Sequence, residues 1–281
     1  MSCLRVVART ATLRQASGCR SRCSPPFVLV VLTWRHAPIS GMEIMNAQAF
    51  TERLFSSMVS GDRNEARRLV QEARGEGMAA EMMTHEVFWP IVEMITNLYR
   101  QDQLTALSHH YATRLMRMLL DQAQSEYIQG DRNGRRICLF SGPGEADELA
   151  GQLVADMAEA AGYEVFFAGG GIANDEILEE VGSRTPDILL MFASSAGDAP
   201  NIRVLIDTIR EIDSHPDLQI VVGGGVFNRA PGLAEEIGAD LWAKNPLELL
   251  QQLTTNPERR ATPEQRTVGR SVEKRENRRV A

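Results

Sequence analysis

The stretch Arg135–Gly162, RRICLFSGPGEADELAGQLVADMAEAAG, decides the fold class because it joins a strand, a turn and a helix. Its apolar run 137–140 is typical of a buried parallel strand. Ser141-Gly-Pro-Gly continues neither strand nor helix, and apolar residues then recur at helical spacing up to a C-capping glycine. Doubly wound α/β proteins bind ligands at such loops. The glycines could equally serve only the turn.

The same alternation continues downstream of Gly162. Further strands are expected at residues 164–168, 187–193, 219–222 and 241–243. Helical patterns follow each of them, beginning near residues 174, 201, 233 and 247. Parallel strands need helical crossovers, so five strands that are each followed by a helix predict a parallel sheet with helices on both faces.

Residues 47–125 show a helical pattern with short breaks, which predicts a small antiparallel bundle of four helices. Asp62 is the expected N-cap of the second helix, and Pro90 should kink or restart the third. The fourth helix is expected to turn its apolar stripe inward, namely Leu107, Tyr111, Leu115, Met118 and Leu119. The predicted domains are thus a cap at 46–130 and an α/β domain at 134–253.

Charge is uneven along the chain. Residues 1–42 contain six arginines and no acid, residues 254–281 contain eight basic and four acidic residues, and the segment between them contains 16 basic and 33 acidic residues. A core this acidic repels a phosphate backbone, which argues against direct nucleic-acid binding by the core.

Residues 254–281 have little apolar content, residues 1–44 are rich in arginine, serine and cysteine, and disorder is predicted for both segments. The apolar run 27–32 is too short to span a membrane. The first segment fits either a start codon placed too far upstream or an organellar transit peptide. The four cysteines form no disulfide framework, so a reducing cytoplasm is expected.

With these residues described, the chain resembles the cobalamin-binding domain family. This family joins a helical cap to a Rossmann-like corrinoid-binding module, as in methionine synthase, corrinoid methyltransferase proteins and light-sensing cobalamin-dependent repressors. The family turn, Asp or Glu, any residue, His, two residues, Gly, aligns with Glu145 to Ala150, and the distance to Gly162 matches. In the cap, the family's aromatic residue and its Glu-His pair align with Tyr99 and with His109-His110.

The resemblance implies a four-helix cap followed by a flavodoxin-like five-stranded parallel sheet. It also implies that the cofactor-binding residues are Tyr99, His109, His110, Glu145, Asp147, Ala150, Phe192, Ser194, Gly223, Gly224 and Phe227. No catalytic residue and no protein metal ligand is expected.

Three departures from the family pattern lie along one channel. Asp147 stands where the family has the histidine that binds cobalt, and a carboxylate is a poor replacement for an imidazole nitrogen. Phe192 replaces a small residue and would fill the channel for the nucleotide tail, while Ala150 adds a methyl group in place of a glycine. Cobalamin that keeps its own base on cobalt (base-on) is therefore predicted. Haem, held by His109 or His110, is the alternative, as is the absence of any cofactor.

The function predicted first is a non-catalytic sensor or regulator that passes its ligand state through the cap to a partner protein. The alternatives are a corrinoid carrier that works with a methyltransferase, and a scaffold without a ligand. Adjacent histidines on a helix point about 100° apart, so His109 and His110 do not make a two-ligand metal face. The sequence contains no nucleophile–base arrangement, metal-ligand cluster or phosphate-loop lysine, so no enzyme activity is expected.

Overall fold

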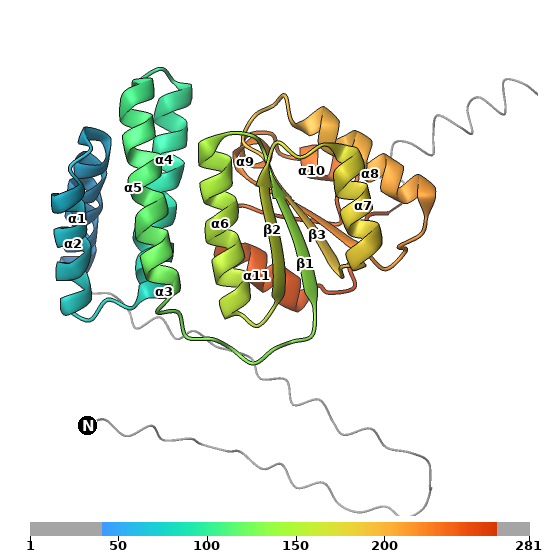
Figure 1. Cartoon of the computed structure of the whole chain (residues 1–281), viewed down its shortest axis with the longest axis horizontal. Coiled ribbons are helices and arrows are strands. Elements are labelled where there is room, and N and C mark those ends of the chain that lie inside the picture. Colours follow the sequence, from blue (N-terminus) through green and yellow to red (C-terminus); the bar gives the residue numbers. More distant parts are fainter. Residues whose placement is uncertain (1–40, 263–281) are drawn as a thin grey trace, which may run out of the picture. The chain divides into compact units, whose positions relative to one another are not determined.

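The computed structural model describes the backbone of residues 41–262 and the side chains of residues 48–262. A helical cap comes first, with the elements α1 (Gly41–Ser60), α2 (Arg63–Gly75), α3 (Ala80–Met83), η1 (Thr84–Phe88), α4 (Trp89–Arg100) and α5 (Ala106–Gln124). Because α3, η1 and α4 continue one another, this is the predicted four-helix bundle (Figure 1). The last four residues of the predicted leader, 41–44, belong to α1, and the rest of that leader lies outside the described residues.

The third helix of the bundle changes its hydrogen-bonding pattern before Pro90. The π-helical turn η1 precedes it, and Pro90 lies in the first turn of α4, where its missing N–H costs nothing. The hydroxyl groups of Thr84 and Tyr127 are 2.5 Å apart and hold the π-helical turn against the segment that follows α5. The predicted restart at Pro90 is confirmed, and it places Trp89 at the beginning of α4.

The predicted inward face of α5 is only partly correct. Leu115 and Leu119 are buried, and Met118 packs at the border of the core. Leu107 and Tyr111, however, are 61% and 44% exposed. The buried face near the start of α5 is formed instead by small and polar side chains, namely His109, Ala112 and Thr113.

The α/β domain follows with β1 (Arg136–Ser141), α6 (Glu145–Ala160), β2 (Glu164–Gly170), α7 (Asn174–Arg184), β3 (Ile188–Phe192), α8 (Ala199–Ile212), β4 (Gln219–Gly223), α9 (Gly225–Arg229), α10 (Leu233–Glu236), β5 (Leu241–Ala243) and α11 (Pro246–Thr255). The strand order is β2-β1-β3-β4-β5, and every pair is parallel. This is the flavodoxin-like order, so the predicted fold class is confirmed.

The two faces of the sheet belong to different cores. Ile188, Leu190 and Phe192 of β3 face the core that contains α6, α11 and the cap. Leu189 and Met191 point to the other face, which α7 and α8 cover (Figure 1). The strand order reverses between β1 and β3, and the carboxyl ends of these strands form the edge where doubly wound sheets bind ligands.

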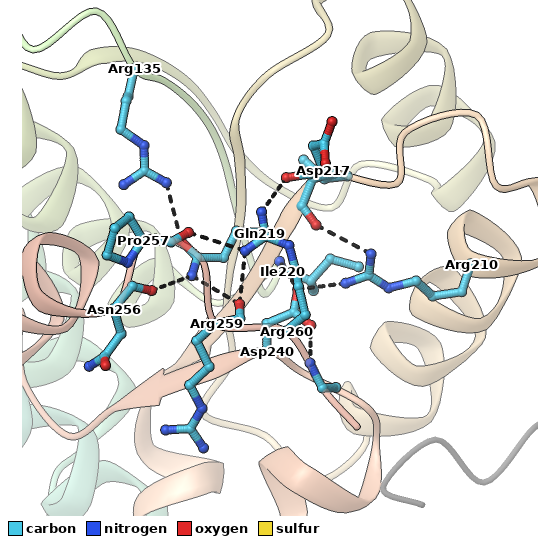
Figure 2. A network of polar contacts seen from close by, with 12 residues as sticks. Arg135, Arg210, Asp217, Gln219, Ile220, Asp240, Asn256, Pro257, Arg259 and Arg260 are labelled. Atoms are coloured by element: carbon cyan, nitrogen blue, oxygen red, sulfur yellow. Dashed lines mark hydrogen bonds and ion pairs between the residues drawn. The ribbon is translucent and has the colours of Figure 1, made fainter. Parts of the chain in front are cut away.

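The segment after α11 is packed against the sheet, in contrast to the disorder predicted from residue 254 onward. The Gln219 side-chain amide donates to the carbonyl groups of Asn256 and Arg259 at 2.9 and 3.2 Å (Figure 2). The Ala261 N–H donates to the buried carboxylate of Asp240 at 2.6 Å. The buried side chains of Gln219, which begins β4, and Asp240, which precedes β5, thus hold the backbone of this polar segment up to residue 261. Residues 263–281 lie outside the described part.

None of the helices within residues 41–262 is both long and apolar enough to cross a membrane.

Candidate functional site

The loop between β1 and α6 brings two carboxyl groups together at the carboxyl edge of the sheet. The Gly142 N–H donates to the Phe192 carbonyl at 2.7 Å, which holds the loop over β3. A Cβ atom at Gly142 would lie 2.8 Å from Asp147 Oδ2 and 3.0 Å from Asp198 Oδ2. Gly142 therefore does more than form a turn, because its lack of a side chain makes room for both carboxyl groups.

Asp147 is a buried acid, with 6% of its surface exposed. Burial raises the pKa of its carboxyl group to about 6, and the neighbouring Asp198 carboxylate adds to this increase. Hydrogen bonds from the hydroxyl and backbone N–H of Ser194, together with the Arg229 guanidinium, act in the opposite direction. Near neutral pH this carboxyl group can therefore hold or release a proton.

A cavity of about 130 Å³ lies between α4 of the cap and this edge of the sheet. Four of the predicted site residues line it, namely Asp147, Ala150, Phe192 and Ser194. The other lining residues were not predicted, and they are Trp89, Val92, Glu93, Thr96, Asn97, Ala146, Gly225, Asn228 and Arg229. Ligand pockets usually have about 300–1,000 Å³, so a large ligand can enter only if the cap moves.

Phe192 is one of the residues that line the cavity. Its ring meets the ring of Trp89 edge to face, with the ring centroids 6.2 Å apart. A Cβ atom at Gly223 would lie 3.0 Å from the Phe192 ring, so this glycine makes room for the ring. The buried methyl group of Ala150 lines the same cavity.

The predicted cap residues form a separate cluster that reaches Glu145 at the start of α6. The Tyr99 ring stacks on His109 with the ring centroids 4.0 Å apart. His110 Nδ1 lies 3.3 Å from Glu145 Oε2, which also accepts a hydrogen bond from the Thr113 hydroxyl at 2.8 Å. Tyr99, His109, His110 and Glu145 do not line the cavity.

The two histidines of this cluster differ in burial and orientation. His109 is buried beneath Tyr99, and burial lowers the pKa of its imidazole. The ring centroids of His109 and His110 are 5.9 Å apart and the ring planes meet at 89°. His110 is half exposed, and its Nδ1 atom faces Glu145.

The two remaining predicted residues, Gly224 and Phe227, are enclosed by other parts of the protein. Gly224 has a φ of +103°, and a Cβ atom there would lie 2.3 Å from the Ala193 carbonyl oxygen. Phe227 is 2% exposed and belongs to the core on the α7 and α8 face of the sheet. Neither of them, nor Gly223, lines the cavity.

Comparison with known protein families agrees with this geometry. A family model described as "B12 binding domain" matches residues 135–251, which contain the sheet and the loop with Asp147. A second model of the same description matches residues 51–124, which form the cap. The chain belongs to the B12-binding domain family.

Named relatives of this B12-binding domain are corrinoid proteins. It is 20% identical over 210 residues to monomethylamine corrinoid protein 1 of Methanosarcina mazei, covering 73% of this chain and 95% of that protein. It is 22% identical over 209 residues to monomethylamine corrinoid protein 2 of Methanosarcina acetivorans, covering 72% and 94%. These names describe corrinoid proteins rather than enzymes, in line with the prediction that the chain is not an enzyme.

A solved structure shares the fold. The monomethylamine corrinoid protein of Methanosarcina barkeri has a TM-score of 0.63 and 19% sequence identity, covering 73% of this chain and 96% of that chain. The likeness extends over both the cap and the sheet.

The side chains of this B12-binding domain suit a polar ligand that brings its own metal. Three buried polar atoms near the carboxyl edge have no hydrogen-bond partner, namely Ser141 Oγ, Asp198 Oδ2 and Asn228 Oδ1. Of these residues only Asn228 lines the cavity, where an amide group at the edge of a corrin ring could donate to its Oδ1 atom. Within the described residues, no three His, Cys, Asp or Glu side chains are grouped so as to hold a metal ion. Cobalt would therefore depend on the macrocycle.

Proposed function

We propose that this B12-binding domain is a corrinoid carrier for methyl transfer, in which the chain gives cobalt no nitrogen ligand. The observation that carries the proposal is the cavity under α4, which has Asp147 at its base in a chain that belongs to the B12-binding family. The names of the relatives, corrinoid proteins for methylamines, favour a carrier over the sensor that the sequence predicted first.

A bound corrinoid would supply a cobalt centre that accepts and donates a methyl group. In the cavity Asp147 would offer such a ligand a carboxyl group instead of an imidazole. The Phe192 ring, which contacts Trp89 and approaches Gly223, takes up space that the nucleotide tail would need. A corrinoid that keeps its own base on cobalt would need neither an imidazole from the protein nor a deep channel for the tail.

We infer that the cap opens from the α/β domain along a contact that is polar in part, next to the apolar core that the two share. We call this contact the polar seam; it joins Thr113, Arg117 and Asp121 of α5 to Glu145, Glu148 and Gln152 of α6. Water can replace each of these hydrogen bonds when the cap opens, so opening costs less than exposing an apolar interface of the same size. A carrier must open in this way to present its cofactor to a partner methyltransferase.

Spectroscopy of the reconstituted protein tests this proposal. The full chain, labelled with nitrogen-15, is mixed with aquocobalamin, and the complex is reduced by one electron for electron paramagnetic resonance. Nitrogen from the cofactor's own base splits the cobalt signal into triplets, whereas a labelled histidine would give doublets. We expect triplets for the wild-type protein and doublets only for Asp147→His combined with Phe192→Ser. Doublets in the wild-type protein would refute base-on binding.

The carrier role is tested by loading the protein with methylcobalamin that carries a labelled methyl group. A carrier should transfer the label to a methyltransferase partner or to a thiol acceptor faster than free methylcobalamin does. Transfer no faster than that of free methylcobalamin would leave corrinoid binding intact but would contradict the carrier role.

One observation favours the sensor as a second candidate. Glu145 begins the helix that carries Asp147, and it is also bound by Thr113, His110 and Arg114 of the cap. A ligand that moves this helix end would therefore loosen the cap. For a sensor, ligand binding should change amide hydrogen exchange in α5 without any methyl transfer. Unchanged exchange in α5 would exclude this candidate.

A further inference from the structure

Arg229 is the only cation among the residues that line the cavity, whose other ionisable lining residues are Glu93 and Asp147. One hydrogen bond holds its guanidinium group, because a terminal nitrogen donates to the Ser194 carbonyl. The other terminal nitrogen lies 2.7 Å from the position that a Cβ atom at Gly225 would take, so the glycine leaves space for it.

Most hydrogen-bonding capacity of this guanidinium is unused. Arginine has five N–H donors, and the Ser194 carbonyl accepts one of them. None of the ion pairs found between described residues includes Arg229, and Asp147 acts on it only as a nearby charge. The position therefore offers a fixed positive charge with free donors.

Arg100 adds a second positive charge from the side of the cap. It ends α4, and its side chain donates to Asn97 Oδ1 at 3.4 Å, while Asn97 itself lines the cavity. Burial lowers the pKa of Arg229, and the like charge of Arg100 lowers it further. One guanidinium group can donate two parallel hydrogen bonds to a phosphate group, so the unused donors of Arg229 suit such a ligand.

We infer that Arg229 binds the phosphodiester of the nucleotide loop of a base-on corrinoid. This inference rests on the proposed function, because it requires that a corrinoid binds. The loop and its phosphate lie on the same side of the macrocycle as the base. Arg229 lines the same cavity as Phe192 and Ala150, and it would hold the phosphate there.

Two corrinoids that differ only in the loop test this site. Aquocobalamin contains the nucleotide loop, and aquocobinamide is the same macrocycle without the loop. Each is titrated by calorimetry into the full-length wild-type protein, Arg229→Gln, Arg229→Lys and the control Arg68→Gln. Arg68 is exposed on α2 and pairs only with Glu65 and Glu72 there.

We expect Arg229→Gln to weaken cobalamin binding about tenfold and cobinamide binding less than about twofold. Arg229→Lys should recover part of the loss because it keeps the charge, and Arg68→Gln should change neither affinity. Circular dichroism checks that each variant is folded. Equal weakening of both corrinoids, or no weakening of either, would overturn the inference.

Competition with inorganic phosphate provides a second test. Added to the wild-type protein, it should weaken cobalamin binding and leave cobinamide binding unchanged. Equal competition against both corrinoids would show that Arg229 holds a free anion and would also overturn the inference. If neither corrinoid binds the wild-type protein, the proposed function fails together with the inference. If the corrinoids bind but neither affinity changes when Arg229 is replaced, the inference is rejected and the proposed function stands.

Discussion

Replacing Asp156 with asparagine tests whether the contact between cap and sheet contains an uncompensated carboxyl group. Asp156 lies one turn beyond Gln152 on α6, and its Oδ2 atom is buried without a hydrogen-bond partner. Burial raises its pKa from 3.8 to about 7, and the carboxylates of Glu159 and Asp121 contribute. At about 1.36 kcal/mol per pKa unit, ionisation would cost the folded state up to about 4 kcal/mol. Water that reaches the site would reduce this value.

The sign of the effect follows from proton binding. Between pH 3.8 and about 7 the folded state keeps the Asp156 proton while the unfolded state has lost it, so the free energy of unfolding falls as pH rises. Asn does not titrate. Urea denaturation should therefore show a gain for Asp156→Asn of about 1.5 kcal/mol at pH 5 and up to about 4 kcal/mol at pH 8. The control Asp131→Asn, at an exposed position, should show no such trend. An equal gain at both pH values, or none, would refute the reasoning.

Three further changes test individual contacts. Asp240→Asn should lower the free energy of unfolding by about 3 kcal/mol in urea, because it leaves Arg210 facing a neutral partner in a buried ion pair; an unchanged midpoint would contradict this. Asp147→Asn should stabilise the protein by up to about 3 kcal/mol at pH 8 and hardly at all at pH 4, because the pKa of Asp147 is about 6; a gain independent of pH would show that titration is not the cause. Gly224→Ala should cost about 2 kcal/mol or more in calorimetry because of its positive φ, whereas Gly182→Ala in α7, with open space around it, should cost nothing.

The sheet could be predicted from sequence because its central strands are buried on both faces. Ile188 to Phe192 are all buried, so β3 appears in the sequence as an unbroken apolar run. The glycine turns then mark where each strand ends. These signals are local, and they agreed with one another along the whole α/β domain.

The prediction failed where a long-range contact decides the structure. The segment after α11 is polar, and its composition indicated disorder, yet Gln219 and Asp240 bind its backbone. Backbone groups are the same in every residue, so no pattern in the segment itself could show this. Similarly, the apolar Leu107 suggested the wrong inward face for α5, because the buried side there begins with His109 and Ala112.

In the candidate site, too, residues with a local sequence signal could be predicted, and residues placed by long-range contacts could not. Asp147 and Phe192 could be predicted because they stand at fixed distances within one β-turn-α unit and one strand. Trp89 was missed because the π-helical turn sets the direction in which α4 begins, and a helical pattern does not reveal such a turn. Arg229 was missed because an arginine after a turn has no pattern of its own. Its place at the cavity depends on the Ser194 carbonyl, which accepts a hydrogen bond from the guanidinium.

The surroundings of Gly142 and Gly223 indicate packing roles for these glycines that the family resemblance alone does not. Gly223 aligns with a glycine on the side of the pocket that holds the nucleotide tail in the family, and the resemblance alone would assign it to the ligand. In the structure a Cβ atom at Gly142 would lie 2.8 Å from Asp147 Oδ2, and one at Gly223 would lie 3.0 Å from the Phe192 ring. Gly142 therefore leaves room for Asp147, and Gly223 allows the Phe192 ring to approach closely. Restoring a histidine at 147 would place a larger ring against Gly142, so the two departures from the family pattern fit the backbone that surrounds them.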